Sequence, residues 1–266
     1  MKIVKIKYDL ELLKCIKNKQ IVVYVDSLDM LECKFAEAKQ NNHVVAFVAL
    51  LPYTSISQIE LKREWAEIPL VIYAYNIGDY DTFFENIEKF KAQDIRIYLH
   101  SRSSNFFTDL KIMSSLGIDC GVFFEEGVRV DDEKLLDLAS YYYISPVPHA
   151  TIEPFEFILR HIRDEENVTF DNVYFDNPLF YTDVSSKLNL EQVDLNNDCF
   201  DLKMQLYYKH FMNLDECSKC PAFKICNHKM LFKLNSCSET MNEIFEYAEM
   251  KNNMKKQQSI KKICQL

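Results

Sequence analysis

The sequence contains very little glycine, only four residues in 266. Loops that cradle phosphate groups contain several glycines, because the backbone must approach the ligand closely and adopt unusual dihedral angles. Neither a G-x-G-x-x-G fingerprint nor a Walker sequence occurs in the chain. The scarcity of glycine therefore argues against a glycine-rich phosphate loop.

Long apolar runs and an excess of basic residues are also absent. No stretch of about 18 apolar residues exists, and residues 1–5 lack the apolar region expected of a signal peptide. The net charge of −9 argues against broad binding to nucleic acids or anionic membranes. We therefore expect a cytoplasmic protein, in which the nine cysteines serve as metal ligands or buried thiols and not as disulfides.

The sequence is rich in apolar residues, at 48%, which is enough for a buried core. Six apolar, β-prone runs begin 22 to 26 residues apart, and helix-periodic segments such as 80–91 lie between them. The runs are 21–25, 44–50, 69–75, 95–99, 119–124 and 141–144. This period predicts an α/β fold with a parallel sheet that curls into a partial (β/α)6 barrel. An ordinary doubly wound sheet has the same local pattern and is the alternative.

A cluster of cysteines follows in the last quarter of the chain. Cys217, Cys220 and Cys226 have the spacing C-x2-C-x5-C, and Cys237 comes eleven residues later. Two thiolates separated by two residues can reach one metal centre, because the intervening turn points both side chains inward. Pro221 restricts the backbone of that turn. We therefore predict a metal centre with these four cysteines as its ligands.

The spacing of these cysteines favours an iron–sulfur cluster but leaves a zinc site open. A zinc site usually shows two C-x2-C pairs, or one pair with two histidines. His228 leaves a mixed Cys/His zinc site open, and Cys199 is a reserve ligand for either metal. The uneven spacing suits a [4Fe-4S] cluster better, because its four irons accept ligands from a long irregular loop.

The segment 216–226, with Cys217, Cys220 and Cys226, resembles the C-x2-C-x5-C part of SPASM-type auxiliary-cluster domains. Those domains follow radical SAM barrels in enzymes that modify ribosomally made peptides. In the family another cysteine follows the third one after a three-residue gap, where this chain has Met230, and the resemblance implies that Cys237 substitutes for it. The family's partial barrel contains six βα units, which agrees with the number of apolar runs.

The same resemblance implies that this chain has lost radical chemistry. Radical SAM enzymes bind their catalytic cluster with a C-x3-C-x2-C triplet in the loop after the first strand. The segment after the run 21–25 contains only Cys33, and the triplet occurs nowhere in the chain. The resemblance thus implies a degenerate, accessory member that presents a peptide or docks a partner maturase.

Polar residues at the ends of the predicted strands form a second group of candidates. In parallel sheets, functional residues gather where the strands end. The candidates are Pro52, Tyr53, Asn76, His100, Ser101, Arg102, Glu125, Glu126 and residues 146–149. His100, Glu125 and His149 could converge as a metal site or an acid–base set, although solvated loop residues are the plainer interpretation. The alternatives to an accessory protein are therefore a metalloenzyme of this kind and a zinc-stabilised α/β scaffold.

The chain divides into three predicted parts. Residues 1–165 form the barrel, 166–198 a linker or cap, and 199–266 the metal domain with a C-terminal helix. The aromatic, β-prone stretch 172–182 offers an edge to which an extended peptide could add. Helices are expected at 9–18, with Asp9 as N-cap, at 153–163, and at 238–266, with Ser238 as N-cap. The last helix is expected to bury Met241, Ile244, Phe245 and Ala248.

Overall fold

The computed structural model shows an α/β fold built on one all-parallel sheet of eight strands that alternate with helices. It describes residues 3–16, 19–26, 28–29, 31–40, 44–50, 54–93, 95–123, 130–163, 181–184, 209, 212–223, 225 and 237–263. The strands are β1 (Ile3–Lys7), β2 (Gln20–Val25), β3 (Val44–Leu50), β4 (Leu70–Ala74), β5 (Ile95–His100), β6 (Cys120–Phe123), β7 (Ile152–Glu153) and β8 (Tyr181–Val184). Their order in the sheet is β7-β6-β5-β4-β3-β2-β1-β8.

The helices between the strands are mostly short. They are α1 (Leu10–Cys15), α2 (Leu31–Gln40), α3 (Tyr80–Glu85), α4 (Ile87–Lys91), α5 (Phe106–Ser115), α6 (Asp132–Ile144) and α7 (Phe155–Ile162). Two 3-10 helices, η1 (Ile56–Gln58) and η2 (Arg63–Glu67), precede β4. Towards the C-terminus follow the four-residue α11 (Asp215–Ser218) and the 27-residue α12 (Cys237–Ile263).

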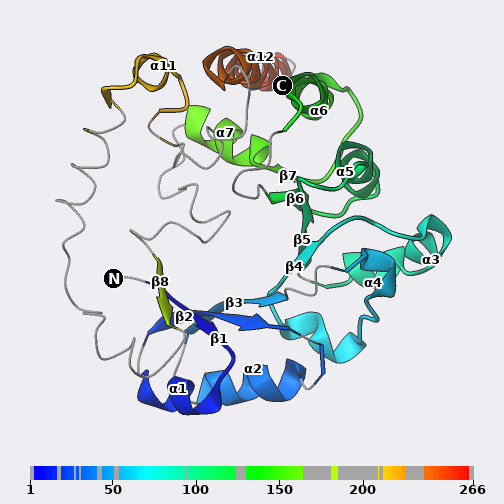
Figure 1. The fold of residues 1–266 in the computed structure, drawn as a ribbon. Helices are drawn as coiled ribbons and strands as arrows, with labels where there is room; N and C mark the ends of the chain where they lie inside the picture. The colour runs from blue at the N-terminus through cyan, green and yellow to red at the C-terminus, as the bar shows by residue number, and fades with distance from the viewer. Residues whose placement is uncertain are drawn as a thin grey trace.

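The order of the strands explains where the helices lie. From β1 to β7 each strand lies beside the next one in sequence, and every pair is parallel. Because parallel crossovers are right-handed, a sequential order places all connecting helices on the same face. Figure 1 shows this arrangement, with a curved sheet and α1 to α6 along its convex side. The strand β8 pairs with β1 at the end of the sheet opposite β7.

Aspartates start several of these helices. Asp9 accepts hydrogen bonds from the backbone N–H groups of Glu11 and Leu12, as predicted. Asp79 and Asp131 cap α3 and α6 in the same way. Each capping carboxylate satisfies backbone donors that have no partner within the helix, and such caps typically stabilise a helix by about 1 kcal/mol. In the sequence, an aspartate therefore stands directly before the first residue of each of these three helices.

Five of the six predicted strand runs are confirmed, and the sixth is wrong. Residues 141–144 form the last turn of α6, not a strand. In place of six strands the sheet has eight, since β1 and β8 also join it and the two-residue β7 follows α6. The strand β8 lies in the stretch predicted as linker or cap. The C-terminal helix begins at Cys237, so Ser238 lies inside it and is not its N-cap.

Candidate functional site

Side chains of the sheet alternate between the helix-covered face and the opposite face, which we call the inner face. The Cys120 thiol donates to the Leu110 carbonyl oxygen of α5 at 3.7 Å, which places Cys120 on the helix-covered face. Its neighbour Gly121 therefore belongs to the inner face. Because Gly121 is in register with Tyr98 and with Glu153, these three residues share that face.

Aromatic rings from three neighbouring strands form a continuous cluster on the inner face. Tyr73 stacks on Tyr98, with ring centroids 5.6 Å apart, and meets Phe123 edge-on at 5.0 Å. The centroid of the His100 ring lies 5.5 Å from that of Phe123 and 5.2 Å from that of Tyr75. Tyr98 and His100 are buried, whereas Tyr75 is 40% exposed. The cluster is thus packed interior that reaches solvent mainly at Tyr75.

A buried carboxyl group lies beside this cluster. Glu153 is only 6% exposed, and its Oε2 accepts a hydrogen bond of 3.1 Å from the Phe157 N–H in the first turn of α7. Burial raises the pKa of Glu153 to about 7, an effect opposed by the Phe157 N–H and by the charges of Arg96 and Arg160. Glu156 adds to the rise. Glu153 therefore exchanges its proton near neutral pH.

The glycine at position 121 makes room for the tyrosine beside it. A Cβ atom there would lie 2.6 Å from Tyr98 Cε1 and 3.0 Å from Glu153 Cβ, so the Tyr98 ring rests against the glycine backbone. Arg96 interacts electrostatically with both Tyr98 and Glu153, and burial raises the pKa of Tyr98. Arg96, Tyr98 and Glu153 thus form a polar group that our sequence interpretation missed. The alternation Ile-Arg-Ile-Tyr-Leu-His in β5 was the available signal, since it indicates a strand with only one apolar face.

Four of the predicted strand-end residues, Asn76, His100, Ser101 and Arg102, lie where the sequence placed them. His100 ends β5, and its Nδ1 accepts a hydrogen bond of 3.3 Å from the Arg102 backbone N–H. Asn76 follows β4, and its Oδ1 accepts a 2.7 Å hydrogen bond from the Ser55 hydroxyl. Ser101 is buried, and its N–H donates to the Phe123 carbonyl oxygen. The candidates Pro52, Tyr53, Glu125 and Glu126 lie outside the described residues.

His149 does not lie at the carboxyl end of a strand, because residues 141–144 before it are helical. It follows α6 and precedes β7, and the next residues, Ala150 and Thr151, bond to Ser114 and Asp119. These partners place the segment at the amino end of β6, whereas His100 is at the carboxyl end of β5. The predicted convergence of His100 and His149 is therefore wrong. The His149 ring instead stacks on Tyr141, with centroids 4.8 Å apart.

The described part of the cysteine segment forms a tight turn. Cys217 lies in α11, and the Cys220 N–H donates to the Cys217 carbonyl oxygen at 3.2 Å. Both side chains are buried, at 7% and 6% exposure, and the two thiols interact electrostatically. Cys237 is also buried and starts α12, which contacts α11. Two of the predicted ligands are therefore adjacent, and a third begins a neighbouring helix.

Hydrogen bonding around Cys220 resembles that of a metal-binding turn. Burial raises the pKa of the Cys220 thiol, and a hydrogen bond from the Ala222 backbone N–H opposes that rise. Such N–H donors stabilise thiolate ligands and tune the metal that they hold. Pro221 precedes this donor, so the amide that bonds to sulfur is the second one after Cys220. The two buried thiols and this N–H donor match part of the surroundings that a thiolate-bound metal requires.

The other predicted ligands cannot be placed. Cys226, Cys199 and His228 lie outside the described residues. Within the described part of the chain, no group of three or more histidine, cysteine or acidic side chains has the arrangement of a metal site. Cys33, in α2, is exposed, and its thiol donates to Glu37 Oε1 at 3.5 Å. The ligand set of four cysteines therefore stays a prediction.

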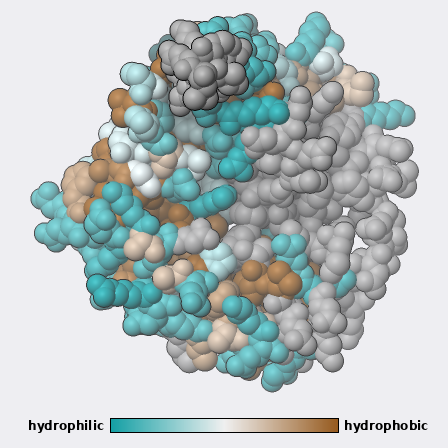
Figure 2. Space-filling model, turned by 180° about the vertical axis from the view of Figure 1, so that it is seen from behind, coloured by the Kyte–Doolittle hydropathy of each residue, from teal (hydrophilic) through white to brown (hydrophobic). Residues whose placement is uncertain are grey.

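Comparison of the chain with protein-family models, with curated proteins and with solved structures found no match. The helices in the described part of the chain do not include a candidate membrane span. Figure 2 shows one side of the surface, where hydrophobic residues lie among hydrophilic ones over the described part. Any statement on function thus rests on the sheet, the cysteine turn and the chemistry of their residues.

Proposed function

We propose that this chain is a radical-SAM-like accessory protein whose C-terminal cysteines hold an auxiliary [4Fe-4S] cluster. Cys217, Cys220, Cys226 and Cys237 are the proposed ligands. The observation that carries the proposal is the buried turn from Cys217 to Cys220 with the Ala222 N–H directed to the Cys220 sulfur. Buried thiols of this kind are inert unless a metal binds them, and their spacing suits an iron–sulfur cluster.

The sheet supports the radical-SAM-like part of the proposal. A partial barrel requires parallel strands in sequential order with the helices on the outside. Strands β1 to β7 follow that order, and Figure 1 shows the helices α1 to α6 on the convex side. The inner face, with its aromatic cluster and Glu153, would then line the interior of the barrel. The accessory role then places the peptide at the part of this face that reaches solvent, beside Tyr75.

The missing catalytic triplet supports an accessory role. The structure adds β1 before the run first taken as the opening strand, and residues 8–9, between β1 and α1, contain no cysteine. After β2 the chain offers only Cys33, which is exposed and bonded to Glu37. One thiol cannot hold a cluster that leaves an iron open for S-adenosylmethionine. The peptide and the partner maturase are therefore the proposed partners, and the radical chemistry belongs to that partner.

Cysteine variants test whether the turn holds the metal. Cys217→Ala combined with Cys220→Ala removes two of the four proposed ligands, so we expect iron and sulfide in anaerobically purified protein to fall to background. The matched control combines Cys15→Ala with Cys33→Ala, since both of these thiols are exposed and lie outside the turn. The control should keep the iron content of the unmodified chain. Equal iron in both double variants would overturn the proposal.

A zinc-stabilised scaffold is the second candidate, because an N–H to sulfur turn also serves structural zinc. In that case the four thiols act only in folding, and metal removal unfolds the C-terminal part. The same variants separate the two candidates. Loss of one zinc, with neither iron nor sulfide in the unmodified protein, would favour the scaffold.

A further inference from the structure

Basic side chains gather where α12 packs on α7 (Figure 1). Arg160 and Arg163 come from the C-terminal end of α7, and Lys251 comes from α12. All three interact with Glu156 of α7, whose Oε1 lies 3.5 Å from Arg160 Nε and 4.0 Å from Arg163 Nη1. Glu156 also accepts a hydrogen bond from the Tyr142 hydroxyl. Three cations therefore share one carboxylate, which leaves two positive charges within this group.

Lys251 has no direct partner for its charge. The residue is half-buried, and its ammonium group forms no ion pair or hydrogen bond with the residues that the structure describes. Burial lowers the pKa of Lys251, and the positive charges of Lys255 and Arg163 lower it further. Each of these two charges has a larger effect than the attraction of Glu156. The protein thus holds this cation in surroundings that a nearby anion would stabilise.

The amide of Asn252, the next residue, is also without a hydrogen bond in the described part of the chain. Asn252 is only 7% exposed, and buried amides normally have partners. Neither polar atom of this amide is fully enclosed, so a ligand can reach it. Lys255 is three residues from Asn252 and four from Lys251, which makes it a neighbour of both on the helix surface. An N–H donor and two ammonium groups therefore lie on one side of α12.

We propose that Lys251 and Asn252 of α12, together with Arg163 of α7, bind a phosphate group. The ammonium, amide and guanidinium groups all donate hydrogen bonds, which phosphate oxygens accept. The two excess positive charges select phosphate over a carboxylate, because a phosphate group carries about −1.5 to −2 at neutral pH and a carboxylate only −1. The ligand is free phosphate or a phosphate monoester. The site needs no metal at the cysteine turn.

Titration of the whole chain with small anions tests this site. The probes are inorganic phosphate and glycerol 3-phosphate, with acetate as the singly charged comparison at equal ionic strength, at about pH 7.5. Isothermal calorimetry measures the affinity, and thermal unfolding measures the stabilisation that binding produces. We expect at least one phosphate probe to bind with a Kd of about 1 mM or lower, and acetate at least about tenfold more weakly. The tighter of the two phosphate probes identifies free phosphate or a monoester as the ligand.

Variants assign the binding to these side chains. Lys251→Gln should weaken phosphate about tenfold, and since the ammonium group has no ion pair to lose, the fold should be kept. Asn252→Leu should weaken phosphate about threefold or more through the lost N–H donors. Arg163→Gln combined with Lys251→Gln should abolish binding at about 10 mM.

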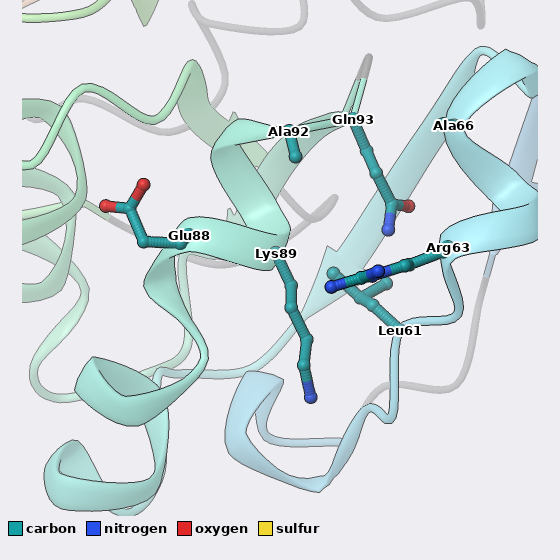
Figure 3. A pocket seen from close by; sticks show the side chains of 7 residues that line it. All are labelled: Leu61, Arg63, Ala66, Glu88, Lys89, Ala92 and Gln93. Carbon is teal, nitrogen blue, oxygen red and sulfur yellow. The ribbon is translucent and has the colours of Figure 1, made fainter.

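The matched control removes one arginine and one lysine elsewhere. Arg63 of η2 and Lys89 of α4 are both exposed and line a groove between these two helices (Figure 3). This groove belongs to the βα units around β4, whereas α12 packs on α6 and α7. Arg63→Gln combined with Lys89→Gln should leave the phosphate affinity unchanged. The control also separates binding from the general stabilisation of proteins by phosphate, which does not depend on a site.

Three results would overturn the proposal. One is the absence of binding of both phosphate probes at about 10 mM, as expected if the acidic residues 164–166, which lie outside the described residues, fill the site. The others are equal affinities for acetate and phosphate, and a phosphate affinity that Lys251→Gln leaves unchanged. None of these outcomes affects the metal proposal, because that is measured by iron content and not by anion affinity.

Discussion

Glu153 is the residue with the most unusual environment on the inner face. Its carboxyl group is buried at the junction of β7 and α7, where it faces Arg96 and Tyr98 from β5 and Glu156 and Arg160 from α7. Burial affects the pKa of Glu153 more than the hydrogen bond and the charges around it do. The pKa therefore rises from 4.5 to about 7. The folded protein therefore holds this proton over a range of pH in which the unfolded chain has lost it.

This difference predicts how stability depends on pH. Between pH 4.5 and 7 the folded state binds the proton and the unfolded state does not, so the free energy of unfolding falls as the pH rises. The total loss attributable to Glu153 is about 3 kcal/mol, and it is complete above pH 7. Glu153→Gln keeps an acceptor for the Phe157 N–H but cannot ionise. Relative to the unmodified chain, the variant should gain about 3 kcal/mol between pH 4.5 and 8.

Urea unfolding at several pH values measures this effect. Exposed Glu85→Gln is the control, and its unfolding free energy should run parallel to that of the unmodified chain. If the unfolding free energy of Glu153→Gln also ran parallel to that of the unmodified chain, the Glu153 carboxyl would be ionised in the folded protein throughout this range. At the residue scale, the alternation in β5 indicates a polar face, but no local pattern predicts that Glu153 is buried against it. Burial of Glu153 results from its register with Gly121, which is a contact between distant parts of the chain.

At the scale of elements, local patterns predicted most of the sheet. The runs that form β2 to β6 are largely apolar because these strands lie in the middle of the sheet. Such runs are recognisable in the sequence without knowing which strands pair with them. Residues 141–144 were misassigned because tyrosine and isoleucine favour strands locally. In the structure they continue a helix capped by Asp131, whose buried residues recur at helical spacing. Strand β7, with two residues, is too short to produce any pattern.

The long helix α12 follows its predicted pattern closely. Met241, Ile244, Phe245 and Ala248 are all buried, as their spacing predicted, and α12 contacts α6 and α7. This apolar stripe attaches the helix that begins with Cys237 to the rest of the fold. The position of that thiol therefore depends on packing as well as on any metal.

Removal of one side chain from this stripe should cost stability. Ile244 is fully buried, so Ile244→Ala should lower the free energy of unfolding by about 2–5 kcal/mol through lost burial and a cavity. Chemical denaturation measures this value. Glu249→Ala, on the exposed side of the same helix, should change it by less than about 0.5 kcal/mol. Similar small effects in both variants would mean that α12 does not pack on α6 and α7 in solution.

At the scale of the whole molecule, the sequence predicted a parallel α/β sheet but not its full extent. The pairing of β8 with β1 joins residues about 180 positions apart, and nothing in either segment specifies its partner. The groove between η2 and α4 was also beyond sequence reasoning, because it depends on how two short helices from different βα units meet. The cysteine turn is the opposite case, since its spacing of two residues fixes the local geometry.

The central proposal is that the cysteine turn, together with Cys226 and Cys237, holds a [4Fe-4S] cluster. The most direct test is the absorption spectrum of anaerobically purified protein, measured together with its iron, sulfide and zinc content. We expect a broad band near roughly 400 nm, with about four irons and four sulfides per chain. A colourless protein with one zinc and no sulfide would contradict the claim and leave the turn as a structural zinc site.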